Sequence, residues 1–104
     1  MRQAARYAAR ATVAKALAHP TRLLIVDELA KRERCVCELT ALVGADISTV
    51  SKHLALLRNA GLVNVERRGA SMLYSLKCPC VSDFFACVDK VISNQAREQM
   101  ALAG

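Results

Sequence analysis

The sequence predicts a mainly α-helical domain with one small β-hairpin. Apolar side chains recur at helical spacing in successive segments between residues 4 and 60. From Leu62 the apolar period changes to two, as in strands, and helical spacing returns after Pro79. The expected order is therefore four helices, a two-stranded hairpin and a last helix.

Two helices are expected before the first cysteine. Residues 4–18 are rich in alanine and only weakly amphipathic, so this helix needs another surface to pack on. Pro20 suits the first turn of a second helix, over residues 20–31, because the N–H that proline lacks would be unpaired there anyway. A charged stretch, residues 31–34, then ends that helix.

Residues 37–60 predict two short helices joined by a tight turn. The first helix, 37–43, ends at Gly44, which suits a left-handed cap. The second is expected to use Ser48 as its N-cap and to bury one stripe of apolar side chains. That stripe recurs at i, i+4 and i+7 and consists of Val50, Leu54 and Leu57. Two helices joined in this way form a helix-turn-helix.

A hairpin is expected over residues 63–77, with Gly69 and Ala70 at its turn. An isolated hairpin is marginal in water, so it must lean on the helices. A helix-turn-helix followed by such a wing is a winged helix-turn-helix.

The whole chain, residues 1–104, is expected to form one domain of this kind, because it contains no repeat, low-complexity segment or linker. Segments 1–18 and 80–104 carry apolar faces that a small core does not need. We therefore predict that they are the dimerisation helices of a homodimer.

Composition and charge favour an intracellular protein with a polyanionic partner. The net charge is +6 and the pI is about 9.4, which favours nucleic acid. No apolar run approaches the ~20 residues of a membrane span, and the basic N-terminus lacks the apolar core of a secretory signal. We expect a cytoplasmic protein that does not enter the membrane. Its five cysteines, an odd number, indicate binding of soft metals or sensing of oxidants rather than a disulfide framework.

The second helix of the helix-turn-helix is expected to lie in the major groove, with its N-terminal half against base edges. Its polar front and the hairpin tip provide the candidate DNA contacts, which are Ser48, Thr49, Ser51, Lys52, His53, Arg58, Arg67 and Arg68. The alternative interpretation is an ordinary amphipathic surface helix followed by a solvated turn.

Cys35 and Cys37 open the first helix of that pair and form the primary candidate metal site. Residues i and i+2 of a regular helix point about 200° apart, so both sulfurs can grip one ion only if the helix start is unwound. Free N–H groups at a helix start also lower a thiol pKa and favour the thiolate. Binding there would distort the helix that positions the DNA-reading helix. The alternative is that both cysteines are small buried residues.

Four stretches together resemble a known family. They are His-Pro-Thr-Arg at 19–22, Cys-Val-Cys-Glu-Leu at 35–39, Ser-Thr-Val-Ser-Lys-His-Leu at 48–54 and Leu-Arg-Asn-Ala-Gly-Leu at 57–62. This combination resembles the ArsR/SmtB family of metal-responsive repressors, over about residues 16–80. The resemblance implies a homodimeric winged-helix repressor that leaves a near-palindromic operator when a metal or metalloid binds.

The chain departs from the family in its thiols. Arsenite-sensing members carry a third cysteine in the same helix, where this chain has Thr40. Since trivalent arsenic takes three soft sulfur ligands, the third must come from elsewhere or be absent. The N-terminal arm has no cysteine, unlike cadmium- and lead-sensing relatives, and the last helix lacks the histidine of zinc-sensing relatives.

The remaining candidates for a third ligand or a second site are Cys78, Cys80 and Cys87. The first two flank Pro79, in a turn where both sulfurs could face one ion. Cys87 would lie about 10 Å from Cys80 along a helix, so it could reach only a sulfur of a partner chain. It could equally be a packing residue, because free cysteine buries readily.

The leading hypothesis is a homodimeric repressor of double-stranded operator DNA that has no organic cofactor. Its effector would be arsenite, antimonite or a soft divalent ion such as cadmium, zinc or lead. One alternative keeps the fold but makes the thiols a redox or persulfide sensor. Another is a nucleoid-type DNA binder with structural cysteines. An enzyme is not expected, because the sequence shows no phosphate loop, carboxylate pair or nucleophile–base arrangement.

Overall fold

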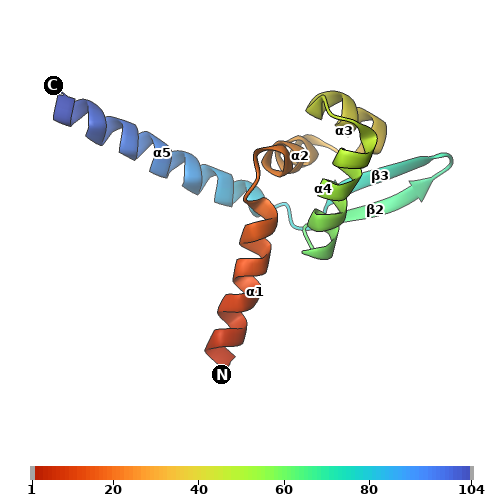
Figure 1. The fold of residues 1–104 in the computed structure, drawn as a ribbon, viewed down its shortest axis with the longest axis horizontal. Helices are drawn as coiled ribbons and strands as arrows, with labels where there is room; N and C mark the ends of the chain where they lie inside the picture. The colour runs from red at the N-terminus through yellow and green to blue at the C-terminus, as the bar shows by residue number, and fades with distance from the viewer. Residues whose placement is uncertain (1, 104) are drawn as a thin grey trace.

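The computed structural model describes residues 2–103, which form five helices and three short strands. In chain order these are α1 (Arg2–Leu17), α2 (Pro20–Lys31), β1 (Arg34–Cys35), α3 (Val36–Val43), α4 (Ile47–Asn59), β2 (Val63–Arg68), β3 (Ser71–Leu76) and α5 (Val81–Ala103). Helices α2, α3 and α4 gather beside the hairpin, and α1 and α5 extend away from this central body in different directions (Figure 1). The expected mainly helical fold with a small antiparallel hairpin is confirmed.

The core lies where α2, α3 and α4 meet. Leu39 of α3 is fully buried, as is the predicted stripe of α4. That stripe, Val50, Leu54 and Leu57, has no exposed surface, and Ile25 and Val26 of α2 are equally buried. The buried apolar face of α4 therefore fixes which of its side chains remain outside.

The wing is a tight hairpin. Strands β2 and β3 pair antiparallel from Val63↔Leu76 to Arg68↔Ser71, so only two residues form the turn. Gly69 has a φ of 61°, and no non-glycine residue among 2–103 has a positive φ. Since a type II′ turn needs a positive φ at its first central position only, Gly69 followed by Ala70 fits that turn.

The sequence interpretation missed one strand. Residues Arg34 and Cys35 form β1, which pairs with β3 through Arg34↔Tyr74 and Cys35↔Leu73 and makes a three-stranded sheet of order β1-β3-β2. Two residues are too few to show a period, so only their place beside β3 reveals the strand.

The N-cap predicted for α4 was wrong. Asp46, not Ser48, caps α4: its Oδ1 accepts from the Thr49 backbone N–H at 2.8 Å, and the helix begins at Ile47. Aspartate caps as well as serine does, and here it lies two residues nearer the loop. The Ser48 hydroxyl instead donates to Asp46 Oδ1 at 3.1 Å.

Both outer helices leave apolar side chains uncovered. On α5, Val81 is the only buried residue of the 23, and Val91 and Ile92 are each more than 60% exposed. On α1 only Ala16 and Leu17 are buried. The predicted dimerisation segments also include residues 1 and 104, which lie outside the described residues.

Candidate DNA interface and thiol sites

The outer face of α4 is polar and exposed. The exposed residues on this face, outside the buried stripe, are Ser48, Thr49, Ser51, Lys52 and Arg58. Hydrogen bonds from Thr49 and then Ser48 hold the pKa of the Asp46 carboxyl below its ordinary value. The start of the helix is therefore capped by an ionised carboxylate, which fixes the first turn of this face.

His53 differs from the other predicted DNA contacts because its ring lies half-buried at the junction with α1 and α2. The ring centroids of His53 and His19 are 4.6 Å apart, and the Arg22 guanidinium lies 3.2 Å from His53 Nδ1. Since arginine can only donate, Nδ1 accepts, which assigns the neutral Nε2–H tautomer. Burial, with the nearby charges of His19 and Arg22, lowers the pKa of His53.

Arg22 connects this junction to the end of α1. Its Nε donates to the carbonyl of Ala16 at 2.6 Å and its Nη2 to that of Lys15 at 3.3 Å. One side chain thus links the C-terminal carbonyls of α1 to His53 on α4. Sequence reasoning placed Arg22 only in a family-like motif and did not find this link.

The wing tip carries the two predicted arginines in different settings. Arg67 is exposed and its Nε donates to the Gly69 carbonyl at 3.5 Å. Arg68 is paired with Glu33 at 2.9 Å and with Glu66 at 3.1 Å, and these hydrogen bonds raise its pKa. Glu33 and Glu66 pair with Arg68 and not with Arg67, so the charge of Arg67 faces solvent.

Cys35 occupies two structural positions at once. It ends β1, opposite Leu73 of the wing strand β3, and it is the N-cap of α3. Its Sγ accepts from the Glu38 backbone N–H at 3.4 Å, and Glu38 Oε1 accepts from the Cys35 N–H at 3.2 Å. This reciprocal pair is a capping box with a thiol in the place of the usual hydroxyl.

Glu38 ties that cap to two arginines. Arg32 Nη2 lies 2.6 Å from its carboxylate, and Arg34 lies 3.9 Å away. The hydrogen bond from Arg32, followed by that from the Cys35 backbone, lowers the pKa of Glu38 from 4.5 to about 2. Arg34 is itself held by Glu28 at 2.8 Å in a largely buried pair. The start of α3 is therefore fixed by hydrogen bonds and charge as well as by packing.

The other thiols take no part in this cap. Cys37 is exposed in the first turn of α3, and Cys87 is exposed on α5. The Sγ atoms of Cys78 and Cys80 are 2.6 Å apart. Thr40, at the position of the third family cysteine, donates its hydroxyl to the Val36 carbonyl at 2.7 Å. Within residues 2–103, no three His, Cys, Asp or Glu side chains come together as a metal site.

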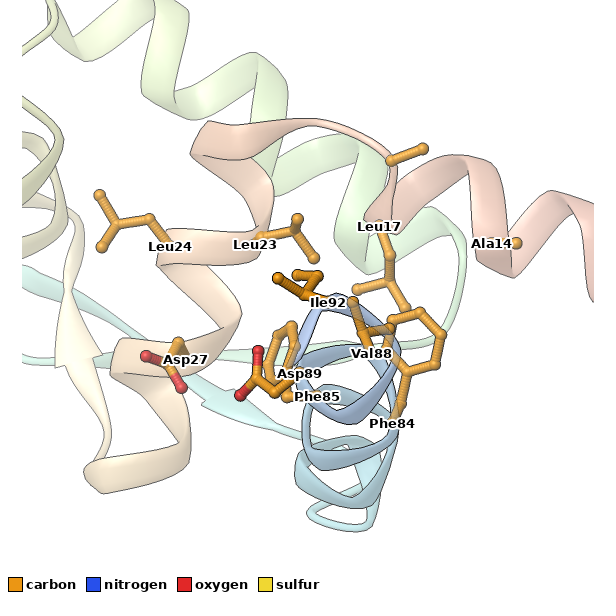
Figure 2. A pocket seen from close by; sticks show the side chains of 11 residues that line it. Ala14, Leu17, Leu23, Leu24, Asp27, Phe84, Phe85, Val88, Asp89 and Ile92 are labelled. Carbon is orange, nitrogen blue, oxygen red and sulfur yellow. The ribbon is translucent and has the colours of Figure 1, made fainter. Parts of the chain in front are cut away.

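An apolar groove of about 510 Å³ runs between α5 and the α1–α2 corner. Figure 2 shows Phe84, Val88 and Ile92 of α5 on one side and Leu17 and Leu23 on the other. None of the helices within residues 2–103 is long and apolar enough to cross a membrane.

Comparisons with known proteins identify the family. Residues 19–65 match the family model described as bacterial regulatory protein, arsR family. The HTH-type transcriptional regulator Rv0081 of Mycobacterium tuberculosis is 36% identical over 97 residues, which cover 92% of this chain and 85% of that protein. The chain belongs to the ArsR/SmtB family. It is therefore a DNA-binding transcriptional regulator and not an enzyme, as the sequence predicted.

Solved structures of ArsR/SmtB relatives agree with this fold. The crystal structure of Rv0081 matches with a TM-score of 0.81 at 36% identity, covering 90% of this chain and 95% of that one. A homodimeric winged helix-turn-helix DNA-binding domain from Mycobacterium bovis also gives 0.81, at 35% identity, covering 93% and 90%. The transcriptional repressor SmtB homolog of Synechocystis is 44% identical over 61 residues, 59% of this chain and 46% of that protein.

Proposed function

We propose that this ArsR/SmtB protein is a cytoplasmic homodimeric repressor, released from operator DNA when arsenite, antimonite or a soft divalent ion binds at Cys35 and Cys37. The soft divalent ions considered are cadmium, zinc and lead. The observation that carries the proposal is the double position of Cys35, which ends the strand paired with the wing and caps the first helix of the helix-turn-helix.

The capping box is the element through which such an effector would act. A ligand that takes the Cys35 sulfur removes the acceptor of the Glu38 N–H and leaves that donor without its cap. Glu38 is also the partner of Arg32, so a shift at the cap disturbs the ion pair that follows. Because α3 packs on α4 through the fully buried Leu39, a displaced α3 changes the placement of the DNA-reading helix.

The donor atoms present suit a thiophilic effector, although one chain provides too few of them. Thiolate sulfur is the ligand that soft ions prefer, and Cys37 is exposed beside Cys35. Trivalent arsenic takes three sulfurs, and within residues 2–103 a single chain gathers no three-ligand group. We therefore propose that the third ligand comes from a thiol of the second protomer or from a small-molecule thiol.

Dimerisation through α1 and α5 would cover the surfaces that a single chain leaves open. The candidate interface consists of the apolar groove between these helices, which Ile92 lines, and the exposed Val91. The related Mycobacterium bovis domain is homodimeric, which supports the same assembly for this chain.

The DNA contacts are proposed on the exposed face of α4 and at the wing. Ser48, Thr49, Ser51 and Lys52 would lie against the major groove, with Arg58 on the phosphates. Arg67 would reach DNA directly, and Arg68 would have to exchange its two carboxylate partners for phosphate. His53 would act by positioning α4, because its ring is held between His19 and Arg22.

A second candidate function is a repressor of the same fold that responds to oxidants or persulfides. The contact between the sulfurs of Cys78 and Cys80 favours it. In that case, oxidation of thiols would replace binding of an ion as the releasing event.

One titration distinguishes the two functions. A DNA duplex selected by the protein itself from a random pool is labelled, and its release is followed by fluorescence anisotropy at fixed salt. Arsenite, cadmium, zinc and hydrogen peroxide are tested on wild type, on Cys35→Ser/Cys37→Ser and on the matched variant Cys78→Ser/Cys80→Ser. Release by arsenite or cadmium that only the first variant loses supports the primary proposal. Release by peroxide alone supports the second function. No release by any of them leaves a DNA binder with structural cysteines and refutes both.

A further inference from the structure

A pair of exposed thiols lies at the connection between the wing and α5. Cys78 and Cys80 are both free and exposed, and their sulfurs are 2.6 Å apart. A disulfide bond is about 2.05 Å long, so the two atoms need to approach by only about 0.5 Å to reach bonding distance. Within residues 2–103, no other two cysteine sulfurs lie in such contact.

The local backbone explains why two sulfurs at i and i+2 converge. Cys78 precedes Pro79, and a residue before proline is driven to extended backbone. The chain then turns at Pro79 and Cys80 before α5 begins at Val81. An extended residue followed by a turn brings the two side chains to the same side, whereas a regular helix would hold them about 200° apart.

The same turn holds the start of α5. The carbonyls of Cys78, Pro79 and Cys80 accept from the N–H groups of Val81, Ser82 and Asp83 at 3.2, 3.3 and 3.0 Å. On the other side, the Lys77 N–H donates to the Leu62 carbonyl at 2.9 Å, which fixes the end of the wing. The thiol pair therefore lies in a short connection that hydrogen bonds hold at both ends. A disulfide between the two sulfurs would keep this connection in its present conformation.

We propose that Cys78 and Cys80 form a peroxide-reactive dithiol that closes to an intrachain disulfide at this joint. In the first step one thiolate attacks hydrogen peroxide, the O–O bond breaks and the sulfur becomes a sulfenic acid, with hydroxide leaving and taking up the thiol proton as water. In the second step the neighbouring thiol attacks the sulfenic sulfur, the S–O bond breaks, the S–S bond forms and a second water leaves. Peroxide is reduced by two electrons and the two thiols are oxidised by two.

Either sulfur can be oxidised first, because both are exposed and each lies within reach of the other. Cys35 is not equivalent to either, because its sulfur already accepts the Glu38 N–H within a capping box.

This inference names the chemistry of the second candidate function and does not depend on the metal-dependent one. The disulfide can form whether or not it changes DNA binding. The closing experiment is therefore chemical, and arsenite-dependent release from DNA is measured separately on the same variants.

The experiment exploits the spacing of lysines. Cleavage after Lys77 and Lys90 places three cysteines, at positions 78, 80 and 87, on one tryptic peptide. The reduced full-length protein is treated with one equivalent of hydrogen peroxide, its remaining thiols are alkylated, and this peptide is weighed by mass spectrometry. We expect most of this peptide to carry one alkyl group instead of three. Its mass should be two hydrogens below that of the same peptide with one alkylated and two free thiols. Reductant should reverse this change fully.

Three variants decide the pairing. Cys87→Ser is expected to lose its two hydrogens as wild type does, whereas Cys78→Ser and Cys80→Ser are expected to form no disulfide within the peptide. A peptide that keeps three alkyl groups after treatment overturns the proposal. So does a disulfide that forms equally well in Cys80→Ser, because it would involve Cys87. A disulfide found only between two copies of the peptide also overturns it.

Discussion

Replacing Cys35 by serine and by alanine separates the two roles proposed for its sulfur, as helix cap and as effector ligand. Serine provides an oxygen that can accept from the Glu38 N–H, so Cys35→Ser is expected to retain the cap. Alanine provides no acceptor, so Cys35→Ala loses the cap and the ligand together. Cys37→Ser is the matched control, because Cys37 is exposed and has no part in the cap.

The size of the cap effect follows from the contact. Loss of an oxygen N-cap costs about 0.5–2 kcal/mol. The Cys35 sulfur is a weaker acceptor and lies 3.4 Å from the Glu38 nitrogen, while the bond from the Cys35 N–H to Glu38 is backbone-donated and persists in the variant. We therefore expect about 0.5 kcal/mol for Cys35→Ala, a fall in Tm of about 2–4 °C. Cys35→Ser and Cys37→Ser are expected to stay within about 1 °C of wild type.

The effector response should follow a different order. All three variants are expected to need at least about tenfold more arsenite for release from DNA, equivalent to about 1.4 kcal/mol. Thermal unfolding by circular dichroism and anisotropy on labelled DNA measure the two quantities independently. Full arsenite response in Cys35→Ser would refute the primary site. Equal stability of the serine and alanine variants would refute the capping argument even if the response were lost.

Three further predictions concern DNA contact, core packing and pH. Lys52→Ala should weaken DNA binding and reduce the slope of log affinity against log salt by about one, whereas Lys90→Ala on α5 should leave that slope unchanged; equal slopes for both variants would remove Lys52 from the interface. Leu54→Ala, at a fully buried site, should lower the free energy of unfolding by about 2–5 kcal/mol in denaturant titrations, and a loss below about 1 kcal/mol would contradict the assigned core. The pKa of Glu38 is about 2 in the folded chain against an ordinary 4.5, so the unfolded chain takes up this proton first; its stabilising effect is present above pH 4.5 and is lost as the pH falls toward 2. Glu38→Gln should flatten that part of the stability profile, and an unchanged profile would show that the Arg32 contact does not hold the carboxylate ionised.

The helix-turn-helix and the wing could be predicted because each rests on local signals. The stripe of Val50, Leu54 and Leu57 repeats at the helical period, and all three side chains are fully buried. Gly44 has a φ of 75°, the left-handed conformation expected of a glycine after a helix. Gly69 similarly has the positive φ that its two-residue turn requires. Such features depend on residues a few positions apart, so a sequence displays them directly.

The cap of α4 shows how far local signals reach. Ser48 and Asp46 both suit an N-cap, and the sequence offers no way to rank two good caps two residues apart. The choice depends on which side chain the preceding loop brings close to the free N–H groups of the first turn. In the structure, the Thr49 backbone N–H donates to the Asp46 carboxylate.

By itself, then, the sequence determined the order of the helices, the exposed polar face of α4 and the turn of the wing, because a repeated apolar pattern and a glycine act through neighbouring residues. Tertiary structure alone decided that Cys35 joins the wing sheet, since β3 is its partner and lies almost 40 residues later in the chain. It also decided that His53 faces Arg22 instead of the outer surface. These two contacts depend on how distant segments are placed in space, which no period in the sequence encodes. The approach of the Cys78 and Cys80 sulfurs, in contrast, was expected from the local turn at Pro79.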